Sequence, residues 1–142
     1  METTERTTPI SVPRGTRDPR QIAPLTLAYI GDTVFDLYVR TRLVERTDST
    51  PHGYHMAAAK VVCAGAQAAA FRRIEGELTD EERSVFRRGR NAHCGTVPKH
   101  ANVTDYHQAS GFEALIGYLY LSGADERLNA LMKRALEGVT ES

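Results

Sequence analysis

The chain has 142 residues, of which 41% are hydrophobic and 25% are charged, and its formal net charge is zero. This length and composition are typical of one globular domain that buries its core without disulfide or metal cross-links. The sequence contains no apolar run of about 18 residues, so we expect no membrane-spanning segment. The polar N-terminus lacks the pattern of a signal peptide, and there are only two cysteines, Cys63 and Cys94. These features predict a protein of a reducing compartment, the cytoplasm.

The zero net charge conceals an uneven distribution along the chain. Residues 75–82 contain five acids and no base, whereas residues 83–100 contain five bases and no acid. A phosphate backbone responds to a local basic patch rather than to the sum over the whole chain. The segment 83–100 is therefore either a nucleic-acid-binding surface or the ordinary solvated face of a helix.

The N-terminal part of the chain divides into an arm and the start of a domain. Residues 1–17 carry no apolar periodicity and predict a flexible arm, and residues 18–142 form the domain. The segment 18–21, Asp-Pro-Arg-Gln, has the pattern of a capping box with proline at the first helical position. A helix is predicted over 24–44, beginning at a proline.

Two further helical segments are predicted in the middle of the chain. Thr50, followed by proline, begins a stretch that continues through the alanine-rich residues 56–74. Thr79 and Glu82 form a second capping box, and Gly89 is the expected end of that short helix. Within this region Cys63 is expected to be a small core residue.

The C-terminal part is predicted to contain a loop and two helices. The loop covers 90–105, an apolar helix covers 109–121, and an amphipathic helix covers 124–136, with Ser122 and Asp125 as its cap. No alternating pattern is long enough for a strand. The prediction is a single all-α domain.

Two of the predicted helices carry acids among apolar residues. The helix 24–44 is apolar on nearly every side and is therefore expected to be buried, yet it contains Asp32 and, one turn later, Asp36. Glu113 is the only charged residue of 109–121. A buried carboxylate must be paired, hydrogen-bonded or bound to a metal. The acids could converge on a hard cation, Mg²⁺ or Mn²⁺, which prefers oxygen ligands.

Two arrangements without a metal would also accommodate these acids. Asp32 could form an ion pair with Arg40 or Arg42, or its carboxylate could point outwards through a groove. The residues alone do not distinguish these arrangements from a metal site.

Three stretches resemble a known family. Residues 27–38, LAYIGDTVFDLY, are similar to the ribonuclease III signature; residues 87–99, RRGRNAHCGTVPK, resemble the basic loop of Mini-ribonuclease III; and residues 111–121, GFEALIGYLYL, resemble the second acidic helix of the family. The resemblance implies a single ribonuclease III-like endonuclease domain, a helical bundle that forms a homodimer. It also implies that Asp32 and Glu113 are catalytic and hold Mg²⁺, with Mn²⁺ as an alternative.

The resemblance further implies an activity and its partners. The enzyme would cut double-stranded RNA and leave 5′-phosphate and 3′-hydroxyl ends. Its substrate would be the precursor of large-subunit (23S) ribosomal RNA, with a ribosomal protein as a further partner. Ala28 and Ser110 stand where larger ribonuclease III enzymes have two more acids, as in the Mini-ribonuclease III branch. Gly65 stands where the branch often has lysine, and the basic loop has His93 and Cys94 in place of lysine and serine.

The RNA-binding residues are predicted from the same basic loop. Basic side chains suit phosphates, and amide and hydroxyl side chains suit ribose hydroxyls. The candidates are Arg87, Arg88, Arg90, Asn91, Thr96 and Lys99. Asp36 either orients a water beside the metal or pairs with an arginine near the dimer axis.

An alternative function belongs to a different class of protein. A non-catalytic protein that docks on structured ribosomal RNA would need the basic residues but not the acids. Asp32→Asn separates the two hypotheses, because a pure binder would bind at least as well without that charge.

Overall fold

The computed structural model describes residues 6, 12–92, 97, 99, 100 and 102–139. Over these residues the chain forms six α-helices and two short 3-10 turns, with no strand in the described part. The all-α prediction is therefore confirmed. The helices are α1 (Pro24–Arg46), α2 (Pro51–Val62), α3 (Ala64–Ile74), α4 (Asp80–Asn91), α5 (Val103–Leu121) and α6 (Asp125–Ala135).

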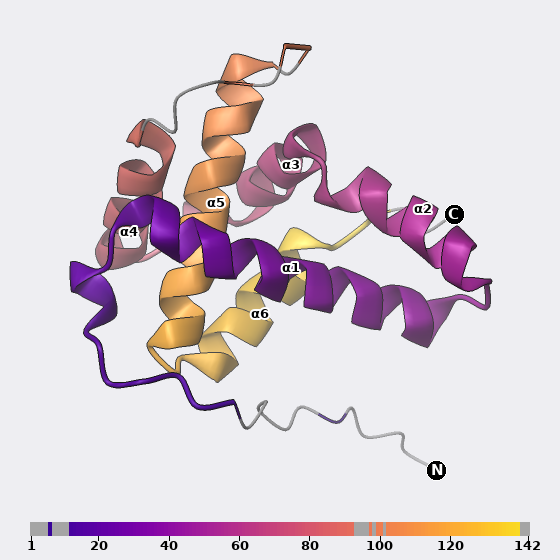
Figure 1. The fold of residues 1–142 in the computed structure, drawn as a ribbon, viewed down its shortest axis with the longest axis horizontal. Coiled ribbons are helices and arrows are strands. Elements are labelled where there is room, and N and C mark those ends of the chain that lie inside the picture. Colours follow the sequence, from indigo (N-terminus) through magenta and orange to yellow (C-terminus); the bar gives the residue numbers. More distant parts are fainter. Residues whose placement is uncertain (1–5, 7–11, 93–96, 98, 101, 140–142) are drawn as a thin grey trace.

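Helix α5 is the centre of the bundle. It lies behind α1, which crosses it at a steep angle, and α4, α3 and α6 pack around it (Figure 1). Nearly every residue from Ala109 to Leu119 is buried. A helix that is apolar on all sides can be stable in water only when neighbours cover it on all sides, which explains the central place of α5.

Two glycines allow α1 and α5 to approach closely where they cross. A Cβ atom on Gly31 would overlap the carbonyl oxygen of Glu113 and would lie 2.7 Å from its carbonyl carbon. A Cβ on Gly117 would overlap the carbonyl oxygen of Leu27 in the same way. The backbones of the two helices are therefore in direct contact at this point.

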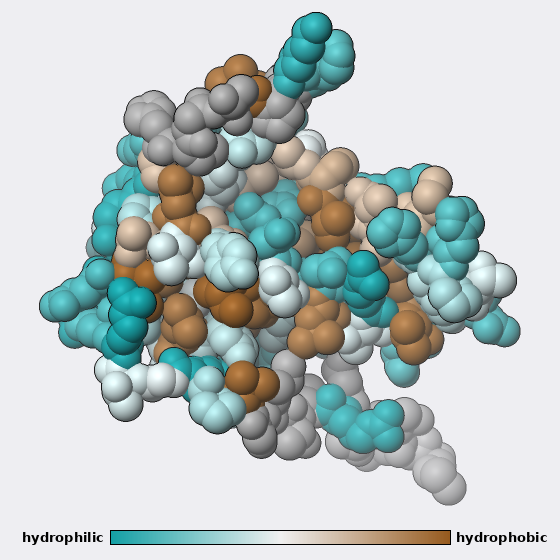
Figure 2. Space-filling model, viewed as in Figure 1, coloured by the Kyte–Doolittle hydropathy of each residue, from teal (hydrophilic) through white to brown (hydrophobic). Residues whose placement is uncertain are grey.

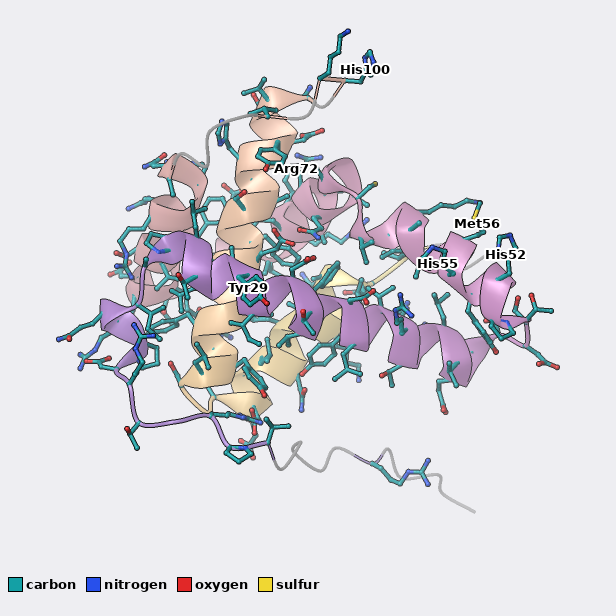
Figure 3. All side chains as sticks on the ribbon, in the orientation of Figure 1. Tyr29, His52, His55, Met56, Arg72 and His100 are labelled. Atoms are coloured by element: carbon teal, nitrogen blue, oxygen red, sulfur yellow. The ribbon has the colours of Figure 1, made fainter. Side chains whose placement is uncertain are left out.

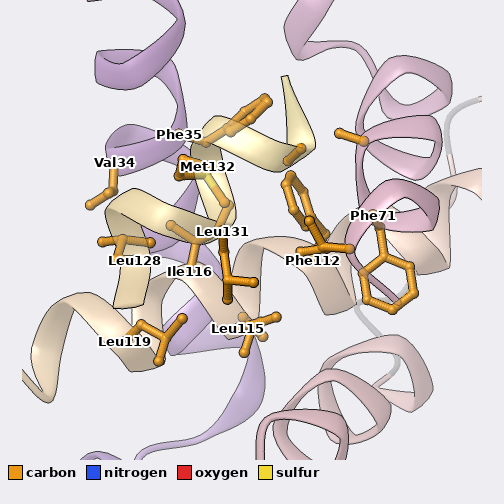
Figure 4. Packing of buried hydrophobic residues seen from close by; sticks show 14 of the residues in the cluster. Val34, Phe35, Phe71, Phe112, Leu115, Ile116, Leu119, Leu128, Leu131 and Met132 are labelled. Atoms are coloured by element: carbon orange, nitrogen blue, oxygen red, sulfur yellow. The ribbon is translucent and has the colours of Figure 1, made fainter. Parts of the chain in front are cut away.

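Aromatic and aliphatic side chains fill the space around the crossing. Phe112 of α5 meets Phe35 of α1 edge to face, with ring centroids 5.2 Å apart (Figure 4). On the other side of the core, Phe71 of α3 stacks on Phe86 of α4 with centroids 3.8 Å apart. Leu131 and Met132 of α6 are also almost fully buried, so one continuous core joins α1, α3, α4, α5 and α6.

Several predicted helix boundaries are confirmed. Helix α1 begins at Pro24, as expected, and Thr50 caps α2 by accepting a hydrogen bond from the amide of Gly53. Thr79 and Glu82 form the complete capping box at the start of α4. These signals are local in sequence, which is why they could be read without the fold.

Gly89 does not end α4, so that prediction was wrong. The helix continues to Asn91, and Gly89 is buried within it. A Cβ on Gly89 would lie 2.6 Å from the Cβ of Ala114 and 3.0 Å from the Cα of Gly111. The glycine is thus explained by the close packing of α4 on α5 rather than by a helix end.

Three further expectations differ from the structure. The predicted helical stretch through 56–74 is interrupted at Cys63, whose extended backbone (φ −67°, ψ 159°) separates α2 from α3; this cysteine is exposed and is not a core residue. Helix α5 begins at Val103, six residues before the predicted start, because Asn102 caps it. Ser122 does not cap α6, which has no side-chain cap.

Two acids of the segment 75–82 pair with arginines of α6. Glu82 pairs with Arg127 at 2.8 Å and Glu77 pairs with Arg134 at 2.8 Å. The hydrogen bonds from Arg127 lower the pKa of Glu82. These two acids are therefore occupied by arginines of α6 and not by the basic residues that follow them in α4.

The segment before α1 contacts the domain. Arg14 forms an ion pair with Asp125 at 2.5 Å and lies over the ring of Tyr120, 4.4 Å from its centroid. The boundary predicted at residues 17 and 18 stays a prediction. Among the described residues no helix is long and apolar enough to cross a bilayer.

Candidate active site

Asp32 and Glu113 lie side by side at the crossing of α1 and α5. Asp32 follows Gly31, the residue whose backbone touches the carbonyl of Glu113. The two carboxylates are within hydrogen-bonding reach of each other. The close helix contact thus brings together two acids that are 81 positions apart in the sequence.

The environment of Glu113 disfavours its charged form. Burial is the main cause, followed by the neighbouring Asp32 carboxylate, and together they raise the pKa of Glu113 from its ordinary value of 4.5 to about 8. Two carboxylates in contact repel each other when both are ionised. A cation between them would remove this repulsion.

Gln67 of α3 is a third polar group at this point, and it was not among the residues predicted from the sequence. Its Nε2 donates hydrogen bonds to Glu113 Oε2 at 3.4 Å and to the carbonyl of Val62 at 3.0 Å. It is the only polar residue between Ala64 and Phe71. A single polar residue in an alanine-rich helix is the feature from which Gln67 could have been identified as a candidate site residue.

The pKa of Glu113 predicts how the stability of the metal-free protein depends on pH. Below pH 4.5 the carboxyl is neutral in both the folded and the unfolded chain. Between pH 4.5 and about 8 it ionises in the unfolded chain first, so stability falls as the pH rises. We expect Glu113→Gln to remove this loss and to raise the Tm at pH 8.5 by about 5 °C or more relative to the wild type.

Thermal unfolding in a chelating buffer from pH 5 to 9 measures this difference. The two proteins should have closely similar Tm values at pH 5 and diverge above it. Curves that stay parallel over the whole range would show that Glu113 ionises normally in the folded protein.

Helix α1 is less buried than its composition suggested. Asp32 is exposed, so the expectation that both acids are buried was wrong for this residue. Tyr29, Leu37 and Val44 of the same helix are also exposed, by 80%, 46% and 65%. One face of α1 is thus open within a single chain, and these three side chains lie on it among polar residues (Figure 2).

Asp36 lies one turn after Asp32 and has a different partner. Its carboxylate pairs with Arg40 at 2.9 Å, an ion pair between successive turns of α1. Arg40 therefore neutralises Asp36, and it is this acid that makes the ion pair considered for Asp32.

The predicted RNA-binding residues occupy the C-terminal half of α4 and the segment after it. Arg87 and Arg88 are exposed on α4, Asn91 is exposed at its end, and Lys99 is exposed in the turn before α5. Arg90 is half-buried, with its guanidinium over the ring of Phe86 at 5.6 Å from the centroid. Thr96, His93 and Cys94 lie outside the described residues.

Arg90 and Asn91 form one wall of a groove. The opposite wall belongs to the first turns of α5 and consists of Thr104, His107 and Gln108. Every one of these five side chains can form hydrogen bonds. Thr104 and Gln108 were not among the predicted RNA-binding residues, because those candidates were all taken from the basic stretch 87–99.

A divalent cation fits the chemistry of Asp32 and Glu113. The described residues contain no cluster of three or more His, Cys, Asp or Glu side chains, which argues against a closed zinc-type site in that part of the chain. Mg²⁺ is commonly held by one or two carboxylates and otherwise by water and substrate phosphate. The carboxylate oxygens of Asp32 and Glu113 are ligands of this kind.

Comparison with known proteins identifies the family. Residues 25–124 match the Ribonuclease III domain family. The chain is 42% identical over 120 residues to the Mini-ribonuclease 3 of Thermoanaerobacter sp. (strain X514), covering 84% of each protein. It is 43% identical over 120 residues to the Mini-ribonuclease 3 of Symbiobacterium thermophilum, covering 84% of this chain and 92% of the relative.

A solved structure has the same fold. The crystal structure of a Fusobacterium nucleatum protein superposes with a TM-score of 0.77 at 25% identity and covers 88% of this chain and 100% of its own. The helix crossing that carries Asp32 and Glu113 lies within the matched domain. The chain therefore belongs to the ribonuclease III family, in its Mini-ribonuclease III branch, and is an endoribonuclease.

Proposed function

We propose that the chain cleaves double-stranded RNA with a divalent cation held by Asp32 and Glu113. The observation that carries this proposal is the contact between the two carboxylates at the crossing of α1 and α5, where the pKa of Glu113 is raised to about 8. Such a pair is costly unless a cation neutralises it. A strongly perturbed acid beside a second acid is typical of catalytic sites.

Asp32 and Glu113 would act by binding and orientation. The exposed Asp32 faces solvent, where a phosphodiester can approach, and the half-buried Glu113 supplies the second ligand from α5. When bound, a divalent cation lowers the pKa of water and stabilises the charge that develops on the phosphodiester. In-line attack of water on phosphorus with departure of the 3′-oxygen would leave 5′-phosphate and 3′-hydroxyl ends. Asp36, whose partner Arg40 lies on the same helix, would stabilise α1 locally rather than take part in the reaction itself.

The duplex would lie along the basic part of α4. The base edges of A-form RNA lie in a deep, narrow groove, so recognition depends on phosphates and ribose hydroxyls. Arg87, Arg88 and Lys99 offer exposed charges. The groove between Arg90 and the start of α5 offers hydrogen-bonding side chains next to them.

The natural substrate is proposed from the family resemblance. We infer that it is the precursor of large-subunit (23S) ribosomal RNA, processed in the cytoplasm and held in shape by a ribosomal protein. The test is incubation of the purified protein with a labelled RNA duplex, with and without Mg²⁺, followed by mapping of the product ends. Metal-dependent cuts with 5′-phosphate ends support the proposal. Binding without cleavage in both Mg²⁺ and Mn²⁺ would favour a protein that docks on structured RNA.

Arg90→Ala is expected to weaken RNA binding about equally for duplexes of different sequence. The guanidinium lies at the groove and would neutralise a phosphate, so the slope of log affinity against log salt should fall by about 1. Binding measured at several salt concentrations gives this slope. Arg134→Ala is the control, because Arg134 lies on α6, pairs with Glu77 and Glu137, and does not line the groove. An unchanged slope for Arg90→Ala would remove Arg90 from the interface.

We also propose that two copies of the chain associate through the open face of α1. Tyr29, Leu37 and Val44 are separated by eight and seven residues and therefore lie on one face of the helix. Exposed apolar stripes of this kind mark association surfaces. A twofold arrangement through α1 would bring together the two copies of the helix that carries Asp32.

Tyr29→Arg is expected to convert the dimer into a monomer. Tyr29 is 80% exposed in the single chain, and its side chain lies in front of α1 in Figure 3. An arginine there should destabilise the fold little, but in a twofold contact it would place two like charges against each other. Light scattering coupled to gel filtration measures the mass. Met56→Arg on α2, also at an exposed apolar residue, should leave the mass unchanged; a Tyr29→Arg protein that stays dimeric would exclude this face.

A further inference from the structure

Gln67 is almost fully buried, with 2% of its surface exposed. Buried amides normally use both their oxygen and their nitrogen in hydrogen bonds. Here Nε2 donates to two acceptors, Glu113 Oε2 and the carbonyl of Val62, whereas Oε1 has no partner among the described residues. An unpaired buried oxygen lowers stability, and an apolar side chain of the same length would avoid this cost.

The two acceptors fix the orientation of the amide. The carbonyl of Val62 can only accept, and so can Glu113 in the ionised form that would bind a cation, so rotation of the amide by half a turn would place Oε1 against two acceptor oxygens. The nitrogen must therefore face Glu113. The unpaired Oε1 is the consequence of this orientation.

The break between α2 and α3 supplies the anchor for this amide. Val62 is the last residue of α2, so its carbonyl is free of the helical ladder, and Gln67 lies in the second turn of α3. The extended backbone of Cys63 places the two within 3.0 Å of each other. One hydrogen of the amide is thus fixed to the backbone and the other is directed at Glu113.

We propose that Gln67 is a positioning residue, which through Nε2 holds the Glu113 carboxylate beside Asp32 in the orientation that ligates a divalent cation. This inference rests on the proposed function of the two acids. It goes beyond that function because it adds a residue of α3 to a site otherwise built from α1 and α5. In a purely structural role, by contrast, Gln67 would only connect α2 and α3 through its hydrogen bond to the carbonyl of Val62.

The test replaces Gln67 with methionine, which has a similar length and no amide. Calorimetric titration of the RNA-free protein with Mn²⁺ measures metal affinity, and steady-state cleavage of a duplex measures kcat and KM. Loss of a group that supports a metal ligand typically costs about 10- to 100-fold in metal affinity. We expect a loss of this size in Mn²⁺ affinity and in kcat at limiting metal, a KM for RNA within about twofold of the wild type, and partial recovery of kcat at high metal concentration.

The matched control is Gln21→Met, at an exposed glutamine of the turn before α1, which should keep the wild-type Mn²⁺ affinity. If Gln67→Met lacks a cooperative thermal transition, Gln67→Asn replaces it, because this variant keeps an amide but withdraws it from Glu113 by one methylene. A folded Gln67 variant with wild-type Mn²⁺ affinity and kcat overturns the inference and leaves the proposed function standing. A wild-type protein that neither binds Mn²⁺ nor cleaves RNA overturns both.

Discussion

Asp32→Asn is expected to lower the rate of duplex cleavage by about a thousandfold or more while duplex binding stays within about twofold of the wild type. Asp32 is one of only two carboxylates proposed to hold the cation, and its amide lacks the charge that a hard cation requires. The loss should exceed the roughly 10- to 100-fold effect of removing a group that merely supports a ligand. Binding is retained because the basic residues of α4 are unchanged, and removal of a negative charge near phosphates does not oppose it.

Single-turnover cleavage and filter binding on the same preparation measure the two quantities. Asp48→Asn is the matched control, since Asp48 is an exposed acid after the end of α1, and it should cleave at the wild-type rate. Asp36→Asn tests the acid one turn away, which is paired with Arg40; a loss as large as that of Asp32→Asn would transfer the central role to Asp36. Cleavage by Asp32→Asn at the wild-type rate would refute the proposed site.

Gly31→Ala is expected to destabilise the protein by about 3 kcal/mol or more, the upper range for overpacking a core. The added Cβ would overlap the carbonyl oxygen of Glu113 and lie 2.9 Å from the amide nitrogen of Gly117. These are backbone atoms, so no side-chain rotation relieves the clash and the two helices must separate. Because Asp32 and Glu113 meet at this crossing, the folded fraction of the variant should also lose metal-dependent cleavage.

Chemical unfolding of three glycine variants isolates the effect of the helix contact. At Gly76 a Cβ would meet nothing within 4 Å, so Gly76→Ala should be neutral or slightly stabilising. At Gly89 the nearest atom is the Cβ of Ala114, and Gly89→Ala should fall between the other two. A Gly31→Ala protein as stable as Gly76→Ala would mean that α1 and α5 can separate at no cost.

The acids could be identified from sequence because their setting is unusual on its own helix. Glu113 is the only charged residue of the apolar stretch 109–121, and Asp32 lies among the apolar residues of 24–44. Both observations need only local periodicity. The contact between the two acids could not be predicted, because it depends on the close approach of two backbones at Gly31. In a sequence, a glycine inside a helical stretch is equally compatible with a helix end and with a close helix contact.

The same ambiguity explains the errors. Gly89 was taken as a helix end, but it is a contact between α4 and α5. The break between α2 and α3 falls at a cysteine and not at a proline or glycine, so the sequence contains no residue there that predicts a helix end. The apolar composition of α1 predicted burial on all sides, whereas a single chain leaves Tyr29 and its neighbours exposed. Apolar composition predicts that a helix face is covered, but it does not predict whether the same chain or a second molecule covers it.

The sequence by itself determined the helical class, most helix starts and the candidate acids, since caps, prolines and periodicity act over a few neighbouring residues. Only the tertiary structure decided that Asp32 meets Glu113 and that Gln67 of α3 reaches Glu113. The physical reason is distance along the chain. Contacts between residues far apart in sequence arise from how closely two helices can pack, and that depends on every side chain at the crossing at once.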